Sequence, residues 1–414
     1  MEYIEQLGVN AKAAEPTVSA MGTTEKNKAL AAISEALRTH ATEILGANQL
    51  DIDAARSNGM SEAMIDRLTL TQARIEGMAQ GVDKVIALPD PIGEVIGGSD
   101  LPNGLHVIKK RVPIGTIGII FESRPNVTVD AAALCFKAGN TVILRGGSDA
   151  INSNKALVGL MRNALGSVGA DMNAIQLVED TSRETANAMM KLNRYIDLLI
   201  PRGGGGLIRA VINNATIPVI QTGEGNCHVY VDESADIDMA VNIIDNAKTQ
   251  RPSVCNAIEN ILVHEKAAPA LFRKLDERWQ GRVAIRGDEA TAKLVTVEKI
   301  ADETDYATEF LDYRLSSKVV KDIDEAIAHI NRFGTKHSEC IVTESLRSAE
   351  LFQQRIDAAA VYVNASTRFT DGFEFGLGAE IGISTQKLHA RGPMGLEALT
   401  TYKYLINGSG QVRK

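Results

Sequence analysis

Short apolar runs alternate with helical patterns through the middle of the chain. Between residues 113 and 221 the runs are GTIGIIF, TVILR, IQLV, IDLLI and IPVIQ, separated by segments whose apolar residues recur at helical spacing. Strands that are apolar on both faces are typical of a parallel sheet covered by helices on each side. The sequence therefore predicts a doubly wound α/β domain, whose ligands bind beyond the carboxyl ends of the strands.

The same alternation starts again after residue 225. The expected helices are 236–249, 267–279, 322–333 and 345–356, and the expected strands are 259–263, 317–320, 339–343 and 359–363. The simplest account of this pattern is a second α/β domain.

Further elements are expected outside these two alternating regions. Residues 23–57, capped by Thr23 or Thr24, and residues 61–78 have helical spacing. Two strand patterns have no sheet of their own, LHVIKKRVP and TTYKYLING. Such a strand often pairs with the sheet of a neighbouring subunit, so these segments predict a homo-oligomer.

Composition narrows the class of protein. The 414 residues are enough for two or three domains, 44% of them are apolar, and the net charge is −8. A negative charge argues against a nucleic-acid or anionic-membrane partner. We expect no secretory signal, because the first residues lack an apolar segment, and no run reaches the about 18 apolar residues that a membrane helix needs. We therefore expect a cytoplasmic protein whose widely spaced cysteines and histidines form neither disulfides nor a metal site.

Cys255 stands apart from the other cysteines. It lies in QRPSVCNAIE, a polar loop in which Arg251 precedes it by four residues. A reactive thiol needs positive charge or backbone donors nearby and a partly open setting. Cys135 and Cys340 instead lie within an apolar helix and strand, as buried cysteines do, and Cys227 is intermediate. The loop position makes Cys255 the candidate nucleophile.

Three turns after strands of the first domain carry candidate ligand-binding residues. In PRGGGG the glycines allow a phosphate to approach a helix N-terminus, although the G-x-G-x-x-G pattern is not met. In TVILRGGSDA an arginine in place of the acid that binds the ribose of NAD suits the 2′-phosphate of NADP, although the nearby Asp149 weakens this inference. The candidates for cofactor binding in these two turns are Arg145, Gly146, Gly147, Ser148, Gly203, Gly204 and Gly205. A flexible turn and a solvated arginine are the respective alternatives.

The third turn, FESRPNVTVD, places two polar side chains where a substrate could be met. These are Arg124 and Asn126, on either side of a proline that stiffens the turn. The alternative for Asn126 is a capping role at the helix expected to begin near Val127.

Four longer stretches resemble the gamma-glutamyl phosphate reductase family, within the aldehyde dehydrogenase superfamily. They are IGTIGIIFESRPNVTVDAAALCFKAGNTVILRGG, GNCHVYVD, QRPSVCNAIE and VYVNASTRFTDGFEFGLGAEIGIST, and the resemblance covers nearly the whole chain. It implies an aldehyde dehydrogenase-like α/β fold with a Rossmann-type cofactor domain, an α/β catalytic domain and a small β oligomerisation element. The implied bounds are 1–102 with 114–225, 226–394, and 103–113 with 395–414, respectively.

The resemblance also implies an activity. It is the NADPH-dependent reduction of L-glutamyl 5-phosphate to glutamate 5-semialdehyde, with release of phosphate, in proline biosynthesis. The family's nucleophile falls on Cys255, whose thiolate would form a thioester that accepts hydride from NADPH. Asn126 is the expected oxyanion donor, and Glu309 in TEFLDYRL the expected contact of the nicotinamide ribose. Association with glutamate 5-kinase is a further implied interaction.

The two anionic groups of such a substrate call for arginine and amide donors. Arg124, Arg251 and Asn364 are the candidates.

Two other functions stay open at this point. A hydrolytic semialdehyde dehydrogenase would need a carboxylate base, and the matching position carries Thr222, with Glu224 two residues away. A nucleotide-binding scaffold without catalysis is the other, since a fold does not fix a function.

Overall fold

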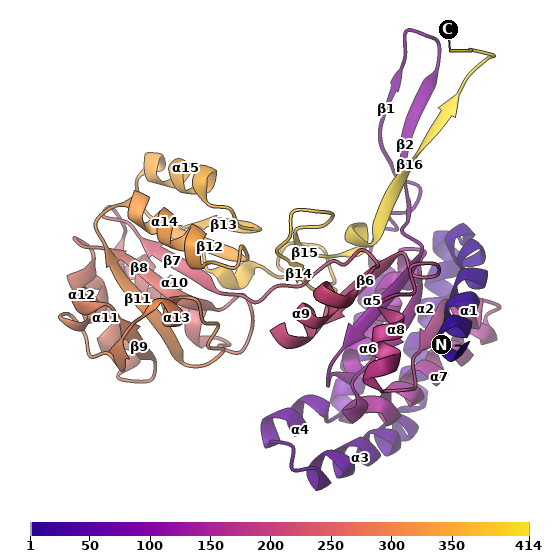
Figure 1. Ribbon diagram of the computed structural model, residues 1–414, viewed down its shortest axis with the longest axis horizontal. Coiled ribbons are helices and arrows are strands. Elements are labelled where there is room, and N and C mark those ends of the chain that lie inside the picture. Colours follow the sequence, from indigo (N-terminus) through magenta and orange to yellow (C-terminus); the bar gives the residue numbers. More distant parts are fainter. Residues whose placement is uncertain (1, 414) are drawn as a thin grey trace. The chain divides into compact units, whose positions relative to one another are not determined.

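The computed structural model describes residues 2–413, which divide into two compact units (Figure 1). Unit 1 contains the described residues up to Gln221, together with Leu377–Gly382 and those from Met394 onward, and unit 2 contains Thr222–Gly376 and Ile383–Pro393. No helix among residues 2–413 combines the length and apolar character needed to cross a bilayer.

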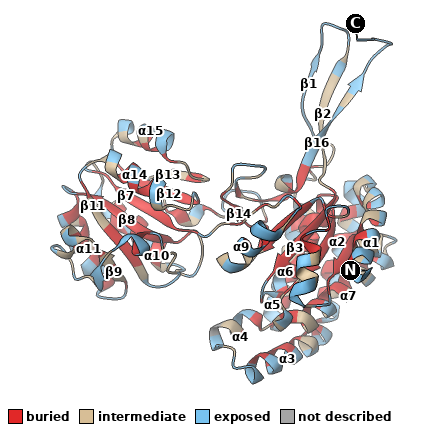
Figure 2. Ribbon diagram, in the orientation of Figure 1, coloured by how far each residue is buried: buried red, intermediate tan, exposed pale blue. Residues whose placement is uncertain are grey.

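Unit 1 is built on a parallel sheet with strand order β5–β4–β3–β6. The strands are β3 (Thr116–Phe121), β4 (Thr141–Arg145), β5 (Ile175–Leu177) and β6 (Leu198–Arg202). The helices are α1 (Glu2–Ala20), α2 (Thr23–Thr39), α3 (Ala41–Ser57), α4 (Glu62–Leu68), α5 (Gln72–Ala87), α6 (Pro125–Lys137), α7 (Ile151–Ser167), α8 (Arg183–Met189) and α9 (Gly205–Asn214), with short 3₁₀ turns η1 (Ser148–Ala150), η2 (Met172–Ala174) and η4 (Leu396–Leu399). Every residue of β3 is buried, and Figure 2 shows buried strands flanked by helices with exposed outer faces. The expected doubly wound α/β fold is confirmed.

Several expected elements of unit 1 differ in the structure. Residues 23–57 form two helices that meet at His40. The N-cap of the first helix is Gly22, and not Thr23 or Thr24 as expected. The N–H of Gly22 donates to the Glu25 carboxylate at 2.8 Å. Residues 61–78 also belong to two helices, α4 and α5. The expected strand IPVIQ is wrong, since it contributes only a single bridge from Val219 to β6.

The N-terminal helix α1 was not expected from the sequence. Its buried stripe consists mainly of small residues, and it contains Pro16, so its apolar periodicity is weak. Ile4 and Ala11 nevertheless pack in one core cluster with Ile143 of β4 and Leu199 of β6. The helix therefore covers part of the sheet that carries the site residues of unit 1.

A separate antiparallel sheet of unit 1 has the order β1–β2–β16 (Figure 1). It comprises β1 (Val95–Asp100), β2 (His106–Pro113) and β16 (Thr400–Asn407). The two expected strands without a sheet, β2 and β16, pair with each other from His106–Asn407 to Pro113–Thr400. The unexpected strand is β1, in a glycine-rich stretch whose residues are all exposed.

Unit 2 is a larger parallel sheet with the order β10–β9–β11–β8–β7–β12–β13. Its strands are β7 (Cys227–Val231), β8 (Ile258–His264), β9 (Ala284–Gly287), β10 (Lys299–Ile300), β11 (Arg314–Val320), β12 (Ser338–Val342) and β13 (Ala360–Val363), and a small antiparallel pair is formed by β14 (Ile383–Ser384) and β15 (Gly392–Pro393). Its helices are α10 (Ile237–Thr249), α11 (Ala268–Trp279), α12 (Glu289–Ala292), α13 (Glu303–Tyr306), α14 (Ile323–Phe333) and α15 (Leu346–Arg355), with a 3₁₀ turn η3 (Thr367–Phe369).

The sheet of unit 2 is covered on both faces. One apolar cluster contains Ile244 of α10 and Leu271 of α11, and another contains Ile327 of α14 and Phe352 of α15. The second α/β arrangement is thus present, and it has two short strands, β9 and β10, that the sequence pattern did not indicate.

Candidate active site

Cys255 occupies the turn before β8 and is half-buried, whereas the other three cysteines are buried. Burial raises the pKa of the Cys340 thiol to about 12 and also raises the pKa values of Cys135 and Cys227. Because the thiolate is the nucleophilic form, burial makes these three thiols unreactive. Cys255 is the cysteine whose setting suits a nucleophile.

The backbone of Cys255 lies against Gly225. A Cβ added at position 225 would be 1.6 Å from the carbonyl oxygen of Cys255, so only glycine fits there. The same carbonyl accepts a hydrogen bond from the Cys227 thiol at 3.2 Å. The segment leading into β7 and the loop of Cys255 are therefore interlocked.

Glu309 joins this arrangement through the same glycine. Its carboxylate accepts a hydrogen bond from the N–H of Gly225 at 2.7 Å. The side chain is half-buried, and this burial, with the nearby negative charge of Glu224, raises its pKa. Two predicted site residues, Cys255 and Glu309, thus contact the two sides of one glycine although they are far apart in the sequence.

A buried ion pair fixes the loop of Glu309 from within the unit. Lys248 and Glu259 are fully buried and their charged atoms are 2.6 Å apart. The second carboxylate oxygen of Glu259 accepts the N–H of Leu311 at 3.1 Å. Burial lowers the pKa of Lys248 and raises that of Glu259, and the close contact of the two groups offsets this cost.

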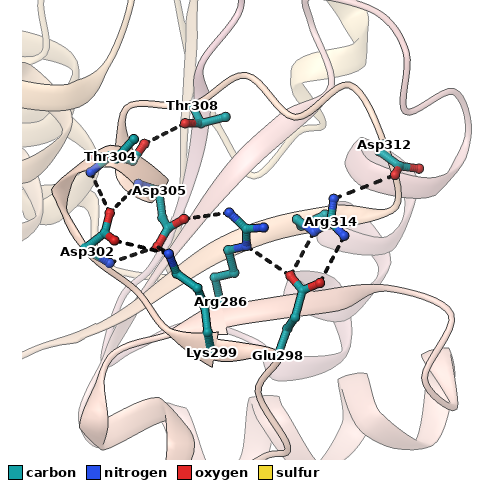
Figure 3. Close-up of polar contacts among 9 residues, drawn as sticks. All are labelled: Arg286, Glu298, Lys299, Asp302, Thr304, Asp305, Thr308, Asp312 and Arg314. Atoms are coloured by element: carbon teal, nitrogen blue, oxygen red, sulfur yellow. Dashed lines mark hydrogen bonds and ion pairs between the residues drawn. The ribbon is translucent and has the colours of Figure 1, made fainter.

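A surface ion-pair network fixes the same loop on its other side (Figure 3). Arg286 donates to Asp305 at 2.7 Å and to Glu298 at 3.0 Å, and Arg314 donates to Glu298 at 2.8 and 3.0 Å. The two arginines, Arg314 first, lower the pKa of Glu298 to about 2. Asp305 belongs to α13, before the Glu309 loop, and Arg314 begins β11, after it. The network therefore anchors both ends of that loop.

The predicted substrate residues of unit 2 have different surroundings. Arg251 is exposed in the loop that carries Cys255. Asn364 has a left-handed backbone conformation, φ +57°, and its side-chain amide bonds to both the N–H and the carbonyl of Thr343 at 2.9 Å. Its amide is thus used to join the ends of β12 and β13.

Sequence reasoning missed Arg368, in η3. This half-buried arginine donates from Nε to Gln250 Oε1 at 2.8 Å, and Gln250 begins the loop of Cys255. No sequence signal distinguishes an arginine in a polar turn, because only the fold brings residue 368 to residue 250.

In unit 1, Arg145 ends β4 and is half-buried. Its Nη2 donates to the Thr181 carbonyl at 2.7 Å, its buried Nε has no partner among residues 2–413, and burial lowers its pKa. A Cβ on Gly146 would lie 2.1 Å from Asn154, and one on Gly147 would lie 2.3 Å from the Asp149 carboxylate. This turn is closely packed, and Ser148 opens η1 directly after it.

The glycines after β6 meet a carboxylate. The N–H of Gly204 donates to Glu122 at 2.8 Å, and a Cβ on Gly203 would lie 2.4 Å from the same oxygen. Gly205 begins α9, so Glu122 occupies the helix N-terminus, where the helix dipole favours negative charge. No sequence pattern indicates the role of this side chain, which competes with a phosphate for the same amide.

Arg124 and Asn126 lie at the start of α6 and are exposed. The helix begins at Pro125, since proline is favoured in the first turn, so Arg124 is its N-cap and the capping role considered for Asn126 is wrong. The Asn126 amide donates to Asp130 at 3.0 Å, and burial raises the pKa of Asp130 to about 6.

The site residues thus fall into one group in each unit. Arg145 ends β4, and Arg124 and Gly203 follow the neighbouring strands β3 and β6, so all three lie at the carboxyl edge of their parallel sheet. In unit 2, the segments of Gly225, Cys255 and Glu309 precede β7, β8 and β11, so they lie at the amino edge of the other sheet.

Comparison with known proteins gives consistent results. A model of the aldehyde dehydrogenase family matches residues 2–296. The chain is 57% identical to a gamma-glutamyl phosphate reductase of Clostridium beijerinckii, over 98% of each chain, and 56% identical to one of Carboxydothermus hydrogenoformans, over 100% of each. The crystal structure of gamma-glutamyl phosphate reductase from Thermotoga maritima is similar with a TM-score of 0.97 and 50% identity, covering 99% of this chain and 100% of that one.

Proposed function

Because the chain belongs to the aldehyde dehydrogenase family and, within it, to the gamma-glutamyl phosphate reductases, we propose that it reduces L-glutamyl 5-phosphate to glutamate 5-semialdehyde and releases phosphate. This is a reductive step of proline biosynthesis. The observation that carries the proposal is the setting of Cys255, the one half-buried cysteine, locked between Gly225 and the following strand. The hydrolytic alternative is not favoured by the relatives.

Cys255 is the proposed nucleophile. Its sulfur attacks the acyl-phosphate carbonyl, the bond to the phosphate oxygen breaks, and a thioester remains on the enzyme. The negative oxygen of the tetrahedral intermediate needs donors, and we assign this role to the N–H of Cys255 and the amide of Asn126. Asp130 accepts from that amide at 3.0 Å and so orients it.

Membership of the aldehyde dehydrogenase family implies a nicotinamide cofactor, and we propose NADPH, which supplies the hydride that reduces the thioester. Arg145 fits a 2′-phosphate because its buried Nε lacks a partner within residues 2–413. Glu309, whose burial raises its pKa, would accept from the nicotinamide ribose hydroxyls. The turns of Gly146 and Gly147, with Ser148, and of Gly203 to Gly205 would approach the remaining phosphates.

The substrate carries an α-carboxylate and a phosphate. Arg251 and Arg124 are the proposed partners for these anions, since guanidinium groups bind them bidentately. Asn364 holds the Thr343 backbone through both ends of its amide, so we assign it to positioning the ends of β12 and β13.

The reverse reaction tests the function most directly. Purified protein is given glutamate 5-semialdehyde and NADP⁺, with and without inorganic phosphate, and NADPH formation is followed. We expect phosphate-dependent turnover, and turnover that is independent of phosphate would instead indicate a hydrolytic dehydrogenase. Cys255→Ser should fold and lose activity by several orders of magnitude, whereas Cys340→Ala, which removes a buried thiol of β12, should retain it.

We also propose two protein partners and a cytoplasmic location. The sheet of β1, β2 and β16 exposes Val95, Tyr402, Tyr404 and Ile406, which are each at least 47% exposed. Exposed apolar side chains on a sheet suit a contact with another copy of the chain. Glutamate 5-kinase is the second proposed partner, because it makes the labile acyl phosphate, and co-migration of the two proteins in sedimentation tests this association.

A further inference from the structure

The turn η3 is attached directly to the residue that follows Cys255. The Thr367 hydroxyl donates to the Asn256 carbonyl at 2.7 Å, and the Asn256 amide donates to the Thr370 carbonyl at 2.9 Å. The same amide reaches the Arg368 carbonyl at 3.3 Å. These bonds hold η3 and the loop of Cys255 as one rigid assembly within unit 2.

Arg368 projects from this turn toward the loop of Cys255. Its Nε bonds to Gln250 at 2.8 Å, which fixes the plane of the guanidinium group. Burial lowers its pKa, the like charge of Arg251 lowers it further, and Cys255 acts in the opposite direction. Arg368 is therefore close enough to interact electrostatically with both Arg251 and the thiol of Cys255.

Neither of the two arginines has a carboxylate partner among residues 2–413. Within residues 2–413, Arg368 and Arg251 form no ion pair, whereas Arg286, Arg314 and Arg391 of the same unit each do. Asp371 raises the pKa of Arg368 through its charge, but the two residues form no ion pair within residues 2–413. Two guanidinium groups of like charge beside Cys255 form a positively charged surface that can bind an anion from outside the chain.

We infer that Arg368, together with Arg251, forms the subsite for phosphate: the phosphoryl group of the acyl phosphate in reduction and inorganic phosphate in the reverse direction. The inference rests on the proposed function. The phosphate oxygen is bonded to the carbonyl carbon that the Cys255 sulfur attacks, so phosphate must stand next to that sulfur. Three carbon atoms separate the α-carboxylate from the same carbon, and a monoanion calls for one guanidinium rather than two.

The subsite also matches the change in charge during the reaction. When the sulfur–carbon bond forms and the carbon–oxygen bond breaks, the electron pair of the broken bond leaves with phosphate. Phosphate then takes a proton from solvent, and no oxidation or reduction occurs in this step. Negative charge grows on the leaving group in the transition state, where two fixed cations stabilise it most.

The reverse reaction separates the two anions, because phosphate and semialdehyde are titrated independently. Arg368→Gln should raise the KM for inorganic phosphate about 10- to 100-fold, as expected for loss of a charged hydrogen-bonding partner, with the KM for semialdehyde changed less than about twofold. Arg368→Lys, which keeps the charge, should recover part of the loss. Arg273→Gln, an exposed arginine of α11, is the matched control and should behave as the wild type.

The alternative outcomes are distinct. A raised KM for semialdehyde with an unchanged KM for phosphate would place the α-carboxylate at Arg368 and overturn the inference, as would two unchanged values. Phosphate-independent turnover by the wild type would instead remove the proposed function. Should Arg368→Gln fail to fold, Arg251→Gln carries the test, because Arg251 is exposed and its replacement leaves the core intact; an unchanged KM for phosphate there also overturns the inference.

Discussion

Replacing Gly225 by alanine tests how tightly the site is built. An added Cβ would lie 1.6 Å from the carbonyl oxygen of Cys255, 2.3 Å from its carbonyl carbon and 2.6 Å from its Cα, whereas real Cβ atoms do not come within 3.0 Å. All three are backbone atoms, so no side-chain rotation relieves the clash. The two segments must separate by about 1.4 Å, the difference between 3.0 and 1.6 Å.

A displacement of this size is large for catalysis, since misplacing a reacting group by about 1 Å can cost about 100-fold in rate. We expect kcat/KM of Gly225→Ala to fall at least about 100-fold, equivalent to about 2.7 kcal/mol in activation free energy. Overpacking also costs about 1–3 kcal/mol of folding free energy. The assay is phosphate-dependent oxidation of the semialdehyde, corrected for the folded fraction measured by chemical denaturation.

The matched control is Gly159→Ala, in α7. Nothing lies within 4 Å of a Cβ built there, and alanine is favoured over glycine in a helix by about 0.5–1 kcal/mol. This variant should be at least as stable as the wild type and fully active. If Gly225→Ala kept kcat/KM within about threefold of the wild type, the assignment of Gly225 as a fixed support of Cys255 would be wrong.

Three further predictions concern other parts of the chain. Arg145→Gln should raise the KM for NADPH about tenfold and leave that for NADH unchanged, and equal efficiency of the wild type with both cofactors would contradict the role of Arg145. Glu298 has a folded pKa of about 2, below its usual 4.5, so its contribution to stability is present above pH 4.5 and is lost as pH falls toward 2. Denaturation of Glu298→Gln should lack this pH dependence, and because the network is exposed to solvent the loss should be smaller at high salt. Deleting residues 400–414 should reduce the number of subunits in the assembly, which light scattering measures as a mass. An unchanged number of subunits would argue against assembly through β16.

The parallel sheets could be predicted because burial on both faces leaves a continuous apolar signal. Short runs such as TIGIIF, bounded by turn residues, are typical of strands buried on both faces of a parallel sheet. The helix α1 was not predicted because several of its buried residues, Gly8 and Ala14 among them, are too small to give a clear apolar periodicity. The contact at Gly8 is nevertheless close, since a Cβ there would lie 2.7 Å from the ring of Tyr195. Small residues at a close contact look the same in a sequence as small residues in solvent.

The half-open setting of Cys255 could be predicted from local context, whereas the residues that support it could not. A cysteine in a polar loop is unusual enough to attract attention, but Gly225 in a polar loop looks like an ordinary turn. Its importance comes from contacts with Cys255 and Glu309, which depend on the register of β7, β8 and β11. The same holds for Arg368, whose partner Gln250 is 118 positions away.

The amino-edge position of the Cys255 site explains why its anion must be bound by side chains. In a parallel α/β unit the helices start at the carboxyl edge of the sheet, as α6 and α9 do in unit 1. Their N–H groups point to that edge and favour negative charge there. The amino edge receives helix C-termini instead, and α10 ends at Thr249, two residues before Arg251. Helix carbonyls at this edge repel anions and attract cations. Arginines are therefore stabilised next to Cys255 by the fold itself, and they supply the positive charge that the backbone cannot.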